Sequence, residues 1–145
     1  MKKNGLIFSI VLVATIALAF VLRFAVSTPE EDFIISVDNY SGRESSEITV
    51  SNDGKVIATI PALKNETTKE VQIPPFDLKS PEFIISYIDK NGKKHDDNRF
   101  EVTSTKSTMN NSLYMSVTKV KDDGTMNIDY SYSSTNGEEI SSQTN

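Results

Sequence analysis

Hydrophobic and polar residues alternate along most of this chain, in short runs separated by residues that favour turns. Leu113, Met115 and Val117 are each followed by a residue with a polar group, and the same spacing recurs from Met126 to Tyr132. An alternation of period two places one set of side chains on a packed face and the other in water, as in antiparallel β-sheets. Beyond Pro29, no stretch has the apolar spacing of an amphipathic helix.

The alternation predicts about eight short strands. Their apolar runs are Phe33–Val37, Ile48–Val50, Val56–Ile60, Val71–Ile73, Phe83–Ile88, Phe100–Val102, Leu113–Val117 and Met126–Tyr132. Turn sequences that contain Asp and Gly, such as Asn52-Asp53-Gly54, lie between several of them, because Gly accepts the positive φ that tight hairpins need. This pattern predicts an all-β fold of the immunoglobulin-like antiparallel β-sandwich type, with a small barrel as the alternative.

The N-terminus has the pattern of a membrane segment. Leu6 to Leu22 is a run of 17 residues without a charge, Gly or Pro, and two lysines precede it. A helix from Leu6 to Val26 would be about 31 Å long, close to the roughly 30 Å hydrocarbon core of a bilayer. The lysines at positions 2 and 3 keep the N-terminus cytoplasmic by the positive-inside rule. Residues 1–27 are therefore predicted to form a transmembrane signal-anchor, with the remaining chain outside the cytoplasm.

A cleaved signal peptide is the alternative interpretation of the same segment. Ala25-Val26-Ser27 has the small-x-small form of a cleavage site, but Arg23 lies close before it. The apolar run also exceeds the 7–15 residues usual in signal peptides, so the sequence favours an uncleaved anchor. Cleavage would make the protein a secreted one. In both cases the domain is extracytoplasmic.

The part after residue 27 divides into a domain and a tail. Residues 28–133 hold all the predicted strands, and a domain of this size buries enough surface to fold without a disulfide or a metal. With 37% hydrophobic and 24% charged residues, the composition is that of a globular protein. Residues 134–145 contain one apolar residue, Ile140, and are predicted to be a disordered polar tail.

The charge of the exported part restricts its partners. It carries 12 basic and 20 acidic residues, a formal charge of −8, and the acidic residues are spread along the chain. Nucleic acid rewards clustered Lys and Arg, so it is not expected as a partner. The same charge disfavours close contact with an anionic lipid surface and keeps the domain soluble.

Candidate chemistry is sparse, because the chain has no Cys and only one His. The group His95–Asn98 has donors for a metal or a general base, but its basic neighbours and its place after a hairpin predict a solvated loop. Asp122, Asp123 and Asp129, with Asn127, have the oxygen ligands of a calcium site. Their spacing is not that of an EF-hand, and Asn127 and Asp129 are expected on the outward face of a strand. We therefore predict no catalytic, metal or cofactor-binding residue, no cofactor and no enzymatic activity.

Four stretches resemble small, single-anchored extracytoplasmic β-sandwich proteins of Gram-positive bacteria. They are the basic and apolar start, Phe33–Ser41, Ile48–Ile60 and Ser86–His95. The resemblance implies an immunoglobulin-type sandwich and carries over no activity and no functional residue.

Two functional classes follow from these observations. The first is a membrane-anchored, non-enzymatic binding or accessory module whose partner is an extracytoplasmic protein, a peptide or a wall component. Its candidate contact segments are Pro61–Thr68 and Pro74–Leu78, although Phe76 and Leu78 are expected rather to close one end of the core. The second class is a hydrolase of wall polymer, which needs two buried carboxylates roughly 5–9 Å apart in a cleft.

Overall fold

The computed structural model describes residues 32–102, 108, 110–134 and 139–142, which form nine strands and no helix. The chain divides into two units at Glu30, and every described residue belongs to the second, Glu31–Asn145. The predicted membrane segment 1–27 lies outside the described residues. In the described part, no helix is long and apolar enough to span a bilayer.

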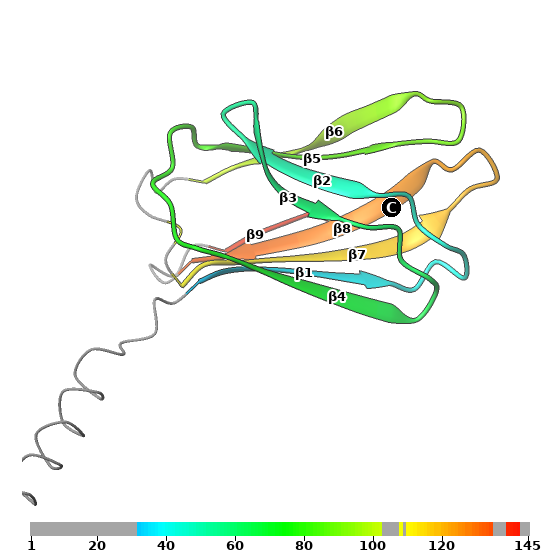
Figure 1. Ribbon diagram of the computed structural model, residues 1–145, viewed down its shortest axis with the longest axis horizontal. Helices are drawn as coiled ribbons and strands as arrows, with labels where there is room; N and C mark the ends of the chain where they lie inside the picture. The colour runs from blue at the N-terminus through cyan, green and yellow to red at the C-terminus, as the bar shows by residue number, and fades with distance from the viewer. Residues whose placement is uncertain (1–31, 103–107, 109, 135–138, 143–145) are drawn as a thin grey trace, which may run out of the picture. The chain divides into compact units, whose positions relative to one another are not determined.

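The nine strands form two sheets (Figure 1). The strands are β1 (Phe33–Asn39), β2 (Ile48–Asn52), β3 (Lys55–Ile60), β4 (Thr67–Ile73), β5 (Glu82–Ile88), β6 (Lys94–Glu101), β7 (Ser112–Val120), β8 (Met126–Ser133) and β9 (Glu139–Ser142). The five-stranded sheet has the order β4-β1-β7-β8-β9, and the four-stranded sheet has the order β3-β2-β5-β6. The all-β prediction is therefore confirmed.

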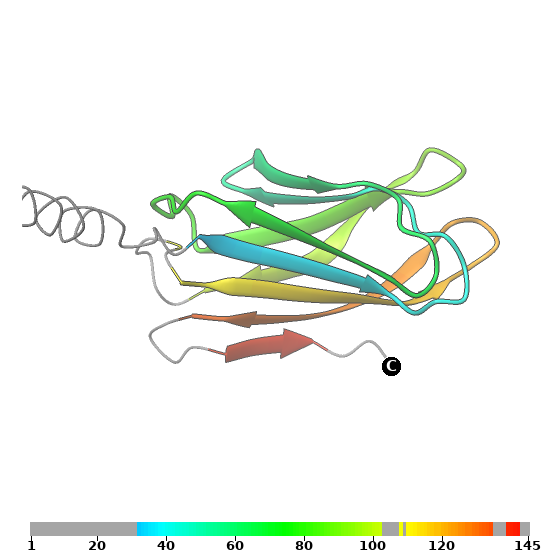
Figure 2. The ribbon, with the colours of Figure 1, turned by 60° about the horizontal axis from the view of Figure 1, so that its bottom comes forward.

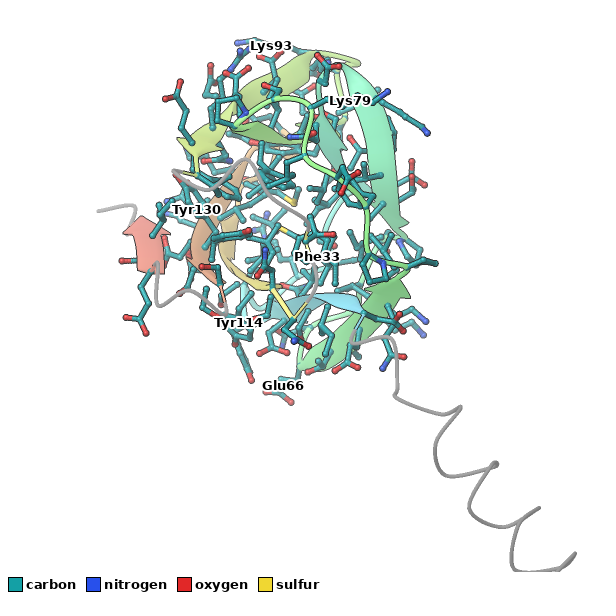
Figure 3. All side chains as sticks on the ribbon, turned by 90° about the vertical axis from the view of Figure 1, so that its left-hand side faces the viewer. Phe33, Glu66, Lys79, Lys93, Tyr114 and Tyr130 are labelled. Carbon is teal, nitrogen blue, oxygen red and sulfur yellow. The ribbon has the colours of Figure 1, made fainter. Side chains whose placement is uncertain are left out.

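The two sheets face each other across one hydrophobic core, as Figure 2 shows from the side. An aromatic cluster fills part of it, and Phe33 lies between the layers (Figure 3). The ring of Phe83 stacks on Phe100 with centroids 5.2 Å apart and lies 5.8 Å from that of Tyr132. Aromatic contacts of this kind join strands of both sheets, so the core is shared between them.

The alternation implies that five apolar side chains, one each in β1, β2, β5, β7 and β8, face the core and that Thr59 of β3 faces the solvent, and the structure confirms both. Five side chains expected to face the core each have an exposed fraction of 1% or less. They are Ile35, Val50, Ile85, Met115 and Ile128. Thr59, expected on the solvent face of β3, is exposed. Alternation of period two thus sets the register of each strand against the core.

One pairing departs from the predicted antiparallel arrangement. β1 runs parallel to β7, with Ile34 opposite Ser112, while the other strand pairs are antiparallel. Alternation reports which face of a strand is buried and contains no information on the direction of its neighbour. The sequence pattern therefore gave no reason to expect this pair.

Two segments expected to be irregular are strands. The group His95–Asn98 was predicted to be a solvated loop, but it lies within β6, paired with β5. The predicted disordered tail is corrected at Glu139–Ser142, which forms the edge strand β9 beside β8. Strand pairing uses backbone hydrogen bonds, so a polar segment can add to an edge when a single apolar residue, here Ile140, packs on the core. The rest of the tail beyond Ser134 lies outside the described residues.

The hairpin between β2 and β3 contains the predicted turn and a bulge. Asp53 and Gly54 have φ values of 51° and 70°, the positive values that a two-residue hairpin turn requires. The register then shifts, so that Val56 and Ala58 lie opposite the successive residues Ser51 and Val50. Ile57 is the extra residue. A bulge bends its strand and redirects side chains, and Ile57 accordingly packs at the margin of the core.

Candidate functional site

A hollow of about 610 Å³ lies beside β3, between the β2–β3 hairpin and the segment that follows β4. Its apolar lining combines side chains of β3, the end of β4 and the proline segment. These residues are Val56, Ile57, Ile73, Pro74, Pro75 and Phe76. A concave, mostly apolar surface of this volume is within the usual range of ligand sites.

The predicted contact segment Pro74–Leu78 has two roles. Phe76 packs on Phe33 with ring centroids 6.3 Å apart, and Leu78 is buried, so both close one end of the core as expected. The backbone N–H of Phe76 donates to Thr108 Oγ1 at 3.0 Å, which fixes the segment to the strand connection that precedes β7. Pro74 and Pro75 end β4 and line the hollow, because proline cannot continue a ladder. The same segment therefore seals the core and forms the wall of the hollow.

The hollow opens along a free strand edge. β3 is the last strand of its sheet, and no other strand of the described residues pairs with its outer edge. Val56 in β3 is 54% exposed and belongs to the lining of the hollow. The rim carries Asp53, Lys55, Asp77 and Lys79, and none of them forms an ion pair within the described ranges. Lys79 is labelled in Figure 3.

The other predicted contact segment, Pro61–Thr68, has a structural role. Leu63 is buried; its N–H donates to Ser45 Oγ and its carbonyl accepts from the N–H of Ser45, each at 2.9 Å. Thr68 lies in β4 and its hydroxyl donates to Asp38. The segment does not line the hollow beside β3.

The only histidine belongs to a largely buried cluster at the β5–β6 hairpin. His95 Nε2 lies 2.9 Å from Asp89 Oδ2, and the imidazole stacks on Tyr87 with centroids 4.7 Å apart. The Tyr87 hydroxyl donates to the carbonyl of Met126 and accepts from its N–H, at 3.0 and 2.8 Å. The partner of His95 is thus Asp89, in the turn before β6, rather than the adjacent Asp96 and Asp97.

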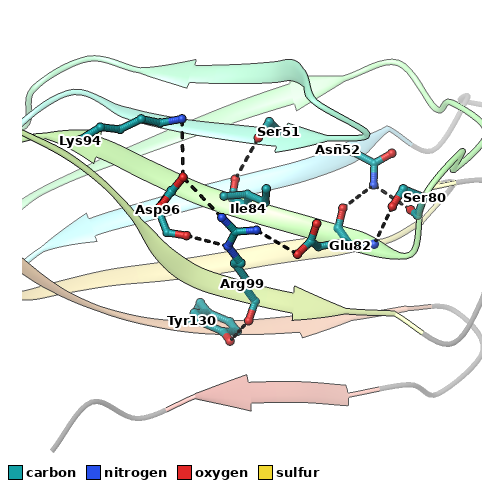
Figure 4. A network of polar contacts seen from close by, with 9 residues as sticks. All are labelled: Ser51, Asn52, Ser80, Glu82, Ile84, Lys94, Asp96, Arg99 and Tyr130. Carbon is teal, nitrogen blue, oxygen red and sulfur yellow. Dashed lines mark hydrogen bonds and ion pairs between the residues drawn. The ribbon is translucent and has the colours of Figure 1, made fainter.

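Asp96 is used in a separate surface network on β6 (Figure 4). Its carboxylate lies 3.8 Å from Lys94 Nζ and 3.4 Å from Arg99, and Arg99 also contacts Glu82 at 3.3 Å. The expected balance of these carboxylates by Lys94 and Arg99 is confirmed for Asp96. The group His95–Asn98 therefore does not converge on a common point.

Asp89 is an ionised anchor for its turn. It is 8% exposed, and its Oδ1 accepts from the N–H groups of Asn91 and Lys93, both at 2.9 Å. The hydrogen bond from His95, followed by that from Lys93, lowers the pKa of Asp89 below its usual value. The sequence indicated this role. An Asp that begins a turn sequence such as Asp-Lys-Asn-Gly typically accepts a hydrogen bond at its side chain from the backbone N–H two residues later.

The lowered pKa of Asp89 predicts an acid-dependent loss of stability. A carboxyl group whose pKa falls on folding stabilises the native state above its unfolded value, about 3.9, and this contribution disappears as the pH falls through the lower folded value. We expect Asp89→Asn to be less stable than the wild type at pH 6, with a difference that shrinks at pH 3. Urea unfolding of both proteins at pH 6, 4 and 3 measures it. A difference that is the same at all three pH values would contradict the assignment.

The candidate calcium donors are not brought together. Asp122 forms an exposed ion pair with Arg43, and Asp123 Oδ1 accepts from the N–H of Thr125 at 2.8 Å. Asp129 lies in β8 opposite Ser116, on the outward face, as expected. Within the part of the chain that the structure describes, no three His, Asp or Glu side chains are grouped as metal ligands.

Stability should therefore be independent of calcium. We expect the thermal midpoint to be the same in excess EDTA as in millimolar calcium, because a ligand that binds only the native state must raise it. Differential scanning calorimetry in the two buffers makes the comparison. A clear rise with calcium would contradict this prediction and would make Asp122, Asp123 and Asp129 the first residues to substitute.

Two carboxylates are buried in the described part of the chain, one in the five-stranded sheet and one in the β5–β6 turn. Asp38 in β1 accepts hydrogen bonds from Thr68 and from Tyr114, whose pKa is raised to about 12 by that bond. Asp89 follows β5 and is bonded as described above. Neither lines the hollow beside β3. The alternation of hydrophobic and polar residues did not identify Asp38, because this pattern does not distinguish a buried, hydrogen-bonded carboxylate from a solvated one.

The comparisons with known proteins give no family. No model of a protein family matches the chain, and no curated protein matches it in sequence. Among solved structures, the NMR structure of a protein from Eubacterium rectale is similar, with 14% identity and a TM-score of 0.45. The similarity covers 70% of this chain and 90% of that one. No functional residue is transferred from it.

Proposed function

We propose that this protein is a membrane-anchored, extracytoplasmic binding module without enzymatic activity. The observation that carries the proposal is the hollow beside β3, an apolar concavity of about 610 Å³ with an exposed Val56 at its edge. Exposed apolar surface gathered in one hollow is characteristic of ligand and protein interaction sites. The partner is an extracytoplasmic protein, a peptide or a wall component.

The membrane anchor is supported by residues 1–27. Their apolar run has the length of a bilayer span, and the lysines before it favour a cytoplasmic N-terminus. A signal peptide cleaved after Ser27 would instead release the same domain, and this secreted form is the alternative. In either form β1 would be retained, since it begins at Phe33.

We further propose that the sandwich is immunoglobulin-like. This is supported by two facing sheets of four and five short strands, tight turns and a core shared by both layers. The parallel β1–β7 pair is a departure from a purely antiparallel sandwich.

An uncleaved anchor predicts firm membrane association. The protein should stay with the membrane fraction through washes in high salt and in alkaline carbonate, because such washes remove peripheral proteins and leave transmembrane ones. Immunoblotting of the washed membranes at full-length mass makes the measurement, and protease added to protoplasts should remove the domain. Recovery from the medium of a mature form that begins at Thr28 would refute the uncleaved anchor and favour the secreted form.

Site-specific photocrosslinking tests the binding role of the hollow. A photoreactive amino acid placed at Val56 is expected to form a discrete adduct on intact cells, because this side chain lies at the edge of the hollow. The matched control is Thr59, an exposed position on the same strand that does not line it. Adducts of equal yield at both positions, or none at Val56, would refute this site.

A further inference from the structure

The hairpin between β5 and β6, at the upper right of Figure 1, has an asparagine followed by a glycine at its tip. Asn91-Gly92 is the one such pair among the described residues, and Asn91 is exposed. Gly92 has a φ of 80°, and a Cβ added to it would meet no atom within 4 Å outside the neighbouring residues. The backbone nitrogen of Gly92 can therefore approach the Asn91 side chain without a steric barrier.

No other described residue combines these properties. Each of the other asparagines in the described ranges is followed by a residue with a Cβ, which hinders attack by the backbone nitrogen on the asparagine side chain. Asp53-Gly54 and Asp123-Gly124 carry a carboxylate, which is a much poorer electrophile than an amide. A Cβ on Gly124 would also lie 2.8 Å from the backbone nitrogen of Lys90, so the second of these turns is crowded.

From this geometry we propose that Asn91 is a site of spontaneous deamidation and that Asp89 restrains the reaction. The Gly92 nitrogen loses its proton to solvent and attacks Cγ of Asn91. The bond from Cγ to the side-chain nitrogen then breaks, and this nitrogen takes up a proton and leaves as ammonia. Water opens the resulting succinimide ring at either carbonyl, which gives aspartate or isoaspartate. Water is the only co-reactant, and no oxidation or reduction takes place.

Three hydrogen bonds of the native turn oppose this reaction. The N–H of Gly92 donates to the carbonyl of Asp89 at 3.0 Å, and a succinimide nitrogen carries no hydrogen, so ring closure destroys this bond. Asp89 Oδ1 accepts from the N–H groups of Asn91 and Lys93, both at 2.9 Å, and holds the residues on either side of Gly92. The turn must therefore open locally before the ring can close, and the free energy of this opening lowers the rate in the folded protein.

Isoaspartate in place of Asn91 is expected to loosen the junction of two loops. Its main chain is longer by one methylene group, which moves Lys93 relative to the Asp89 carboxylate. On the other side, the N–H of Lys90 donates to the carbonyl of Asp123 at 3.0 Å and joins the hairpin to the β7–β8 loop. The modified protein should therefore have a lower thermal midpoint. The site does not line the hollow beside β3 and does not depend on its role.

Peptide mapping by mass spectrometry tests the proposal on the full chain in phosphatidylcholine nanodiscs, incubated in mildly alkaline buffer. The mass change on replacing ammonia by water measures conversion at Asn91, and electron-transfer fragmentation distinguishes isoaspartate from aspartate. Asp89→Ala should accelerate conversion about twofold to tenfold, the factor that corresponds to one net hydrogen bond. Asp89→Asn keeps an acceptor oxygen and should give a rate between those of the wild type and Asp89→Ala.

Two controls separate local opening of the turn from unfolding of the domain. Ile35→Val shortens a buried side chain of β1 at a similar cost in stability and should leave the rate unchanged. The wild type in concentrated urea lacks the turn and should convert faster than the native protein. Circular dichroism before incubation verifies that each variant is folded in the native buffer.

Several results would overturn the proposal. Absence of conversion at Asn91 in urea would mean that the site is not reactive. A native rate equal to the rate in urea, or no acceleration by either Asp89 variant, would mean that the turn gives no protection. Equal acceleration by Ile35→Val would assign control of the rate to unfolding of the whole domain. The same peptide map resolves Asn4-Gly5 and Asn136-Gly137, which lie outside the described residues, so their conversion is not counted as that of Asn91.

Discussion

Ile85→Ala is expected to lower the free energy of unfolding by about 2–5 kcal/mol, the usual cost of truncating a buried isoleucine. Ile85 has no exposed surface and lies in β5, between Val50 of β2 and Asn98 of β6. Its position in the middle of the four-stranded sheet leaves the neighbours little freedom to collapse into the vacated space. Urea unfolding followed by circular dichroism measures the change.

Thr59→Ala is the control for this experiment. Thr59 lies on the solvent face of β3, and its truncation should change the free energy of unfolding by less than about 0.5 kcal/mol. Equal costs for the two substitutions would mean that the strands are displaced by one residue, because such a slip exchanges the two faces.

Asn39→Leu is expected to cost about 2–5 kcal/mol as well, for a different reason. Asn39 is fully buried, and its Nδ2 donates to the carbonyls of Arg43 and Leu63, both at 2.7 Å. Its Oδ1 accepts from the N–H and the hydroxyl of Ser41. Leucine has a similar size but no polar atoms, so all four of these hydrogen bonds would be lost, at about 0.5–1.5 kcal/mol each.

Ser41→Ala is the matched control for Asn39→Leu. It removes one hydroxyl from the same loop, where the hydroxyl is exposed enough to be replaced by water, and should cost less than about 1 kcal/mol. Chemical denaturation of both variants gives the comparison. If Asn39→Leu were no more costly than Ser41→Ala, the amide would not hold the β1–β2 loop.

Strand positions and faces were predictable from the sequence because both depend on local pattern. The alternation around Ile35, Met115 and Ile128 identified buried side chains correctly, and Asp53-Gly54 marked a turn with positive φ. The pairing of β1 with β7 was not predictable, because it depends on which distant strand offers a complementary edge. β9 was missed for a related reason. A polar segment forms a strand because a neighbouring strand, here β8, offers backbone hydrogen bonds, and its own composition does not show this.

The candidate sites were predictable only in part. The proline segment Pro74–Leu78 was named in advance and does line the hollow beside β3. The bulge that turns Ile57 toward this hollow has no distinct sequence pattern and follows from how β2 and β3 pair. The partner of His95 was also missed, because hairpin geometry places Asp89 beside it while strand geometry directs its immediate neighbours elsewhere.

The central place of β1 has a consequence for the order of folding. β1 is the first strand of the domain, yet it lies between β4 and β7 in the five-stranded sheet. Its parallel partner begins only at Ser112, and folding slows as contacting residues become more distant in the sequence. If the chain is exported as proposed, β1 leaves the translocation channel before the other strands and remains without this neighbour until almost the whole domain has followed. The four-stranded sheet, complete by Glu101, is therefore expected to form earlier than the five-stranded sheet.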